Sequence, residues 1–178
     1  MDKLIAIALG SENACIEKHE LINGVLYEKK ELNKSEEKIV RYLYESFDKF
    51  RLSERPFDKI EVPQSETPLN SIENTRVKPE IAVTASEEDK PTWIVEFGDI
   101  NTDTYALCVK TQIYFTAGVS EYWVVDSLNK CIAIYVFEKN GLIPTIIDQP
   151  QRIKLSIYKT FFLSWSDMFE GKNKKTKK

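Results

Sequence analysis

Residues 77–126 read VKPEIAVTASEEDKPTWIVEFGDINTDTYALCVKTQIYFTAGVSEYWVVD, and this stretch decides the fold. It contains three apolar, strand-like runs at 77–85, 92–97 and 121–126, and a helix-like segment at 102–117. A strand, a helix and a second strand in this order form a right-handed crossover in which the two strands are parallel. The pattern therefore predicts that 92–97 and 121–126 share one sheet.

A carboxylate, Glu96, stands among the bulky apolar residues of the second strand. Alternation along the strand places it on the same face as Ile94, where a charge requires a partner. Lys110 lies in the middle of the following helix, on the face that it shares with Tyr114. If that face packs on the sheet, Lys110 reaches Glu96. A structural ion pair and a functional site are equally compatible with this pattern.

The segments before this stretch predict a hairpin and a helix. Within residues 20–28, Asn23-Gly24 joins two short strand-like runs, and this dipeptide is the strongest short hairpin signal. Asn33 precedes Glu36 by three residues, as a capping box requires, and apolar residues follow at helical spacing. A helix is therefore predicted over about 34–50.

The remaining segments give weaker signals. Residues 63–75 are polar and predict a loop, and 131–137 predicts another strand. The region 144–158 has weak strand signals, and 161–169 resembles a short apolar helix or turn. Together the segments predict an α/β protein with a mixed central sheet flanked by helices.

Length and charge bound the domain organisation. At 178 residues, the chain predicts a single domain over 1–171 and a disordered, lysine-rich tail over 172–178. The tail supplies five positive charges to a net charge of −3, so residues 1–171 carry −8. An acidic body argues against tight, non-specific binding of nucleic acid, although a local basic patch remains compatible with it.

Composition also limits the location of the protein. No apolar run approaches the roughly 20 residues of a membrane-spanning helix, and the run at 4–9 is shorter than a signal peptide requires. Cys15, Cys108 and Cys131 are odd in number and lack disulfide or metal-ligand spacing, which indicates a reducing, cytoplasmic setting. His19 is the only histidine, so any catalytic triad or histidine-rich metal site would have to rest on it, and a partly exposed histidine without such a role is favoured.

The order helix, strand, strand, strand, helix, strand, with acids on the second and third strands and a lysine on the next helix, resembles the PD-(D/E)XK nuclease superfamily. More narrowly, the chain resembles the Uma-type family of restriction-endonuclease-like proteins. The resemblance covers about Glu20 to Phe169. Its specific motifs are ELING at 20–24 and AGVSEYWVVD at 117–126, and Pro79-Glu80 and Ile94-Val95-Glu96 add to them.

This resemblance implies a restriction-endonuclease-like αβββαβ core and a metal-dependent endonuclease that hydrolyses DNA. It implies catalytic roles for Glu80, Glu96 and Lys110. Glu80 and Glu96 would bind Mg²⁺, or Mn²⁺ in its place, with the Phe97 backbone carbonyl as a further ligand and Glu20 as a peripheral one. Lys110 would orient or help deprotonate the attacking water. Nucleases of this superfamily often cut duplexes as two-fold pairs, so a homodimer is expected.

Four features depart from the family pattern, and one of them is the turn after Glu96, which reads GDINT at 98–102 where the family has a serine- and proline-containing turn. Glu80 stands where aspartate is usual, Ala106 replaces an acid one turn before the lysine, and Glu36 or Glu37 occupies the place of a histidine near the first helix. A protein can retain the fold of its family while the residues of its site take on a different function. The alternative function is therefore a non-catalytic interaction or binding protein that keeps the nuclease fold.

Overall fold

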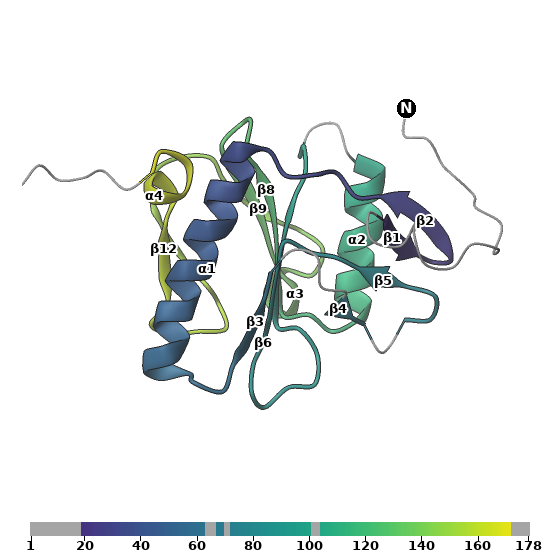
Figure 1. Ribbon diagram of the computed structural model, residues 1–178, viewed down its shortest axis with the longest axis horizontal. Helices are drawn as coiled ribbons and strands as arrows, with labels where there is room; N and C mark the ends of the chain where they lie inside the picture. The colour runs from purple at the N-terminus through teal and green to yellow at the C-terminus, as the bar shows by residue number, and fades with distance from the viewer. Residues whose placement is uncertain (1–18, 63–66, 70–71, 101–103, 172–178) are drawn as a thin grey trace, which may run out of the picture.

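The computed structural model describes residues 19–62, 67–69, 72–100 and 104–171. A central mixed sheet lies between two helices, with α1 (Lys34–Glu54) on one face and α2 (Thr104–Thr116) on the other (Figure 1). The apolar run at 4–9, Cys15 and the tail at 172–178 lie outside the described residues. Within the described part of the chain, no helix is long and apolar enough to span a membrane.

The central sheet has six strands, in the order β10-β9-β8-β7-β6-β3. β7 and β8 are parallel, and the other neighbouring pairs are antiparallel. The predicted crossover is thus confirmed, with α2 connecting two adjacent parallel strands. The strands are β3 (Lys59–Glu61), β6 (Ile81–Thr84), β7 (Trp93–Phe97), β8 (Glu121–Asp126), β9 (Cys131–Val136) and β10 (Thr145–Ile147).

A second, four-stranded sheet has the order β2-β1-β5-β4 and contains the predicted hairpin. Its strands are β1 (His19–Ile22), β2 (Val25–Glu28), β4 (Thr67–Pro68) and β5 (Arg76–Val77). The hairpin turn has positive φ at both Asn23 and Gly24, as a two-residue turn of type I′ requires. The remaining elements are α3 (Phe137–Asn140), α4 (Trp165–Phe169) and the antiparallel pair β11 (Arg152–Lys154) and β12 (Phe162–Ser164).

The prediction of one strand over 77–85 is wrong. Val77 pairs with Thr67 in the small sheet, whereas Ile81 pairs with Val95 in the central sheet. Pro79 lies between the two strands and has no backbone N–H to donate to a ladder, so the chain leaves one sheet there and enters the other. Glu80 consequently lies immediately before β6, at the junction of the two sheets.

Smaller differences affect element ends. α1 begins as predicted, with Asn33 accepting from the backbone of Glu36 and the Glu36 carboxylate accepting from the backbone of Asn33, but it continues to Glu54. The segment 63–75, predicted as a loop, contains the short strand β4. The region 161–169 forms β12 followed by the short helix α4.

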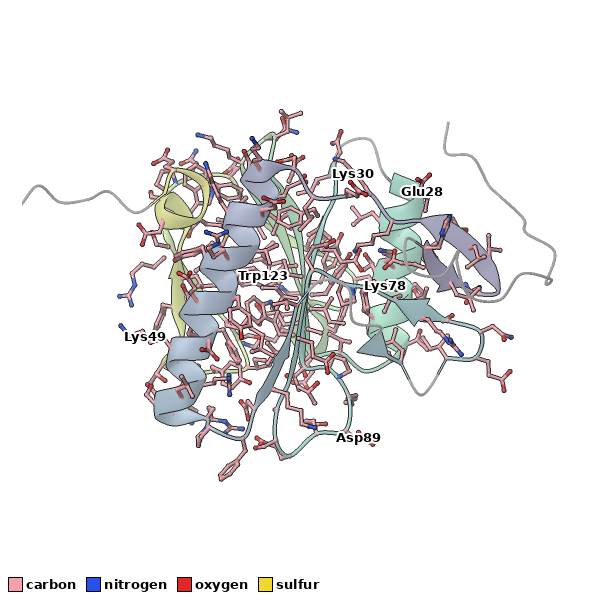
Figure 2. All side chains as sticks on the ribbon, in the orientation of Figure 1. Glu28, Lys30, Lys49, Lys78, Asp89 and Trp123 are labelled. Atoms are coloured by element: carbon pink, nitrogen blue, oxygen red, sulfur yellow. The ribbon has the colours of Figure 1, made fainter. Side chains whose placement is uncertain are left out.

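Two apolar clusters cover the two faces of the central sheet. On the α1 face, Trp93 packs against Phe47 and Trp123, and Trp123 lies in the layer between α1 and the sheet (Figure 2). On the α2 face, Ile94 packs with Tyr114. Successive β7 residues therefore point to opposite faces, as the alternation predicted. Glu96 lies on the α2 face, where it contacts Tyr114.

Candidate active site

Three buried carboxylates meet beside α2. Glu20 comes from β1, Glu80 from the residue before β6, and Glu96 from β7, and their exposed fractions are 4 %, 3 % and 4 %. The small sheet therefore supplies one acid and the central sheet region supplies two. Because a buried carboxylate is costly without a partner, each of them needs a nearby donor or cation.

Lys110 binds two of these acids. Its Nζ lies 2.5 Å from Glu96 Oε2 and 2.6 Å from Glu20 Oε2. Tyr114, one helical turn after Lys110, donates its hydroxyl to Glu96 Oε1. The predicted contact between Lys110 and Glu96 is thus confirmed. Glu20, predicted as a peripheral residue, lies as close to the ammonium as Glu96 does.

Glu80 has a different cation. Lys29 Nζ lies 2.7 Å from Glu80 Oε1, and the backbone N–H of Phe97 donates to Glu80 Oε2 at 3.1 Å. Lys29 follows directly after β2 and also lies 3.9 Å from Glu20 Oε1. The sequence patterns above name Lys110 as the cation of the site and do not predict the contact of Lys29 with Glu80.

The hairpin offers a signal that could have found Lys29. Its register pairs Glu20 with Tyr27, so their side chains lie on one face of the ribbon. Side chains two residues apart along a strand point the same way, which places Lys29 on the face of Tyr27 and Glu20. The Asn23-Gly24 turn alone fixes this register.

The backbone also contributes to the site. The N–H of Lys78 donates to Glu20 Oε1 at 2.7 Å, which ties β1 to the segment between β5 and β6. Lys78 lies on the α2 side of the central sheet (Figure 2). On the loop before α2, the N–H of Ile100 donates to Asp126 Oδ2 at 3.3 Å and links the end of β7 to the end of β8. These bonds fix the elements that carry the acids and Lys110.

The pKa values of the acids shift in opposite directions. Burial raises the pKa of Glu80, and the positive charge of Lys29 offsets this only in part. Burial also acts to raise the pKa of Glu96, but the charges of Lys110 and Lys29, with the hydrogen bonds from Lys110 and Tyr114, lower it overall. Burial acts to lower the pKa of Lys110, yet Glu96 and Glu20 raise it well above its ordinary value. Lys110 is therefore an ammonium and Glu96 a carboxylate at neutral pH.

The donor chemistry fits a hard divalent cation, because the three acids offer only oxygen ligands. Each of their six oxygens accepts from an ammonium, a hydroxyl or a backbone N–H. Among the described residues, no group of three or more His, Cys, Asp or Glu is arranged to hold a metal ion as it stands. A metal ion would therefore have to exchange with one of the ammonium groups.

Comparisons with known proteins agree with this architecture. The model of the Uma2 family, described as "Putative restriction endonuclease", matches residues 11–164. No curated protein matches the chain. A solved structure of a "putative nuclease belonging to DUF820" from Anabaena variabilis ATCC 29413 superposes with a TM-score of 0.69 and 15 % identity, covering 86 % of this chain and 90 % of that one. The neighbour shares the fold, and the family match covers most of the sequence. The chain therefore belongs to the Uma2 family, as its ELING and AGVSEYWVVD motifs predicted.

Proposed function

We propose that this protein is a Mg²⁺-dependent endonuclease that hydrolyses phosphodiester bonds of DNA in the cytoplasm. The observation that carries the proposal is the meeting of Glu20, Glu80 and Glu96 with Lys110 at one place on the α2 face. Buried acids beside a charged lysine, with pKa values pushed apart, are typical of functional sites. The family description supports a nuclease as the class of enzyme.

In this proposal, Glu80 and Glu96 hold Mg²⁺ or Mn²⁺, with the Phe97 carbonyl and Glu20 as further ligands. The bound cation supplies the Lewis acid that polarises the scissile phosphate. Tyr114 fixes the orientation of the Glu96 carboxylate through its hydrogen bond. The protein itself thus orients the Glu96 carboxylate, independently of substrate.

Lys110 has the role of an electrostatic group in this site. Its raised pKa keeps it protonated, so it donates hydrogen bonds and accepts no proton. It would orient the attacking water and stabilise the negative charge that develops on the phosphorane-like transition state. Deprotonation of the water by Lys110 itself is disfavoured by the same shift.

A non-catalytic binding protein is the second candidate function. One observation favours it: all six carboxylate oxygens already have donors within the protein. A cluster whose carboxylate oxygens all accept from groups of the protein can hold two sheets and a helix together without any metal. The two candidates differ in whether the cluster accepts a divalent cation.

Calorimetric titration with Mg²⁺ or Mn²⁺ separates these functions. We expect a saturable site in the wild type at millimolar metal and its loss in Glu96→Ala, together with metal-dependent nicking of plasmid DNA by the wild type and not by Glu96→Ala. Glu45→Ala removes an exposed acid of α1 and serves as the control, with unchanged binding. No heat and no nicking from the wild type would favour the binding protein.

We also propose that the protein acts as a homodimer, because duplex cleavage by two-fold pairs needs two sites. Light scattering at micromolar concentration should give about twice the chain mass of 20.6 kDa. A mass near 20.6 kDa across a concentration series would contradict the dimer.

A further inference from the structure

The proposed function leaves the role of Lys29 open. Its Nζ lies 2.7 Å from Glu80 Oε1, on an acid that is 3 % exposed. The Lys29 side chain is itself 19 % exposed and follows the last residue of β2, so it reaches the acid from the rim of the site. Its neighbour Lys30 points outward, with a side chain that is 84 % exposed (Figure 2).

The formal charges show why Lys29 matters. Three carboxylates and two ammonium groups leave the cluster with one net negative charge, and Lys110 is shared between Glu96 and Glu20. Without Lys29, the Glu80 carboxylate would keep only the Phe97 N–H as a direct partner among the contacts described above. A buried carboxylate that loses its cation is strongly destabilising.

The Glu80 oxygen that binds Lys29 is also the one that a hard cation would need. Its other oxygen accepts from the Phe97 N–H, and both oxygens of Glu96 are bound by residues of α2. An ammonium and a divalent cation repel each other at contact distance, and most strongly where burial excludes water. The two cations therefore compete for Glu80 Oε1.

We propose that Lys29 is an internal counter-cation: it neutralises Glu80 in the metal-free protein and leaves that carboxylate when a divalent cation binds. This inference rests on the proposed function, since it assigns the metal to Glu80 and Glu96. It makes Lys29 a positioning residue that keeps the acids together until the metal arrives. Lys29 also lowers the affinity of the site for a divalent cation, because the Lys29–Glu80 ion pair must break each time the metal binds.

The test compares Lys29→Met with the wild type in two measurements. The melting temperature of the metal-free variant should fall, because Glu80 loses its cation. The calorimetric Kd for Mg²⁺ should tighten by about tenfold, because no ion pair has to be broken. The stability difference between the two proteins should therefore narrow at saturating Mg²⁺. Lys30→Met is the matched control: Lys30 Nζ lies 3.9 Å from Glu36 Oε1, outside the three acids, so this variant should leave the Kd for Mg²⁺ unchanged.

The outcomes separate this inference from the proposed function. If the wild type binds Mg²⁺ but Lys29→Met binds it with equal or weaker affinity, Lys29 only stabilises the fold or assists metal binding. The inference then fails, while the proposed nuclease function is unaffected. If the wild type binds no metal, both fail. Should Lys29→Met not fold, a crystal structure of the wild type with Mn²⁺ decides: the inference requires Lys29 Nζ to have left Glu80 while Lys110 stays on Glu96, and an intact Lys29–Glu80 pair overturns it.

Discussion

Replacing Lys110 by methionine is expected to lower the free energy of unfolding by about 3 to 5 kcal/mol and to eliminate cleavage of DNA. The Lys110 ammonium contacts Glu96 and Glu20, and both acids are almost completely buried. Methionine fills much of the same space, but it leaves two buried negative charges without this cation. Chemical denaturation in metal-free buffer measures the loss.

The loss should depend on pH. In the wild type, burial acts to raise the pKa of Glu96, but Lys110 brings it below the ordinary value of 4.5. A carboxyl group with a lowered folded-state pKa contributes stability above its unfolded-state pKa, and the contribution disappears as the pH falls through the folded-state pKa. In Lys110→Met the Glu96 carboxylate loses this charge, so its pKa rises and it takes up a proton at higher pH. The difference in the free energy of unfolding between the wild type and Lys110→Met should therefore be largest at neutral pH and become smaller as the pH falls toward 4.5.

Gln112→Met provides the control for this variant. Gln112 is an exposed residue of the same helix, two positions away, so it introduces a methionine into α2 without touching the acids. Gln112→Met should change the free energy of unfolding by no more than about 0.5 kcal/mol at every pH. A Lys110→Met protein as stable as the wild type at neutral pH would show that Lys110 does not neutralise these acids.

The part of the fold around β7, α2 and β8 could be predicted because each signal there is local. Apolar runs of strand length flank a helix-length segment, and Gly118 has the positive φ that ends a helix. The face of α2 that carries Lys110 and Tyr114 then packs on the sheet that contains β7 and β8. The Lys110–Glu96 contact follows from these local patterns and the crossover rule.

The rest of the site depends on contacts that no local pattern contains. Val77 and Ile81 are both apolar and buried, so periodicity joins them into one strand, and the break at Pro79 becomes visible only when the two sheets are known. The bond from the Lys78 N–H to Glu20 spans 58 residues of sequence. The pairing of Lys29 with Glu80 likewise joins a residue beside the small sheet to one beside the central sheet, so no local pattern predicts it.

Replacing Glu96 by glutamine should cost less stability than losing Lys110, yet remove the response to metal. Lys110 and Tyr114 donate to different oxygens of Glu96, and in glutamine an NH2 group replaces one of these two acceptors, so one of the two donors then faces another donor. Lys110 keeps its contact with Glu20. We expect a loss of about 1 to 3 kcal/mol in metal-free buffer, the typical cost of a buried group that loses a partner.

The decisive measurement is the stabilisation of each protein by Mg²⁺. A ligand that binds only the folded state at 100 times its Kd stabilises it by about 2.7 kcal/mol, and the wild type should show a rise of this order. Glu96→Gln should show none, because the amide replaces a charged ligand of the metal with a neutral one. The Glu96→Gln, Lys110→Met double variant completes a double-mutant cycle with the two single variants and the wild type. Its coupling energy in metal-free buffer measures the interaction between Glu96 and Lys110 separately from the effect of the metal. A Glu96→Gln protein that Mg²⁺ stabilises as fully as the wild type would remove Glu96 from the metal site, and the nuclease proposal would lose the acid that joins the metal to Lys110.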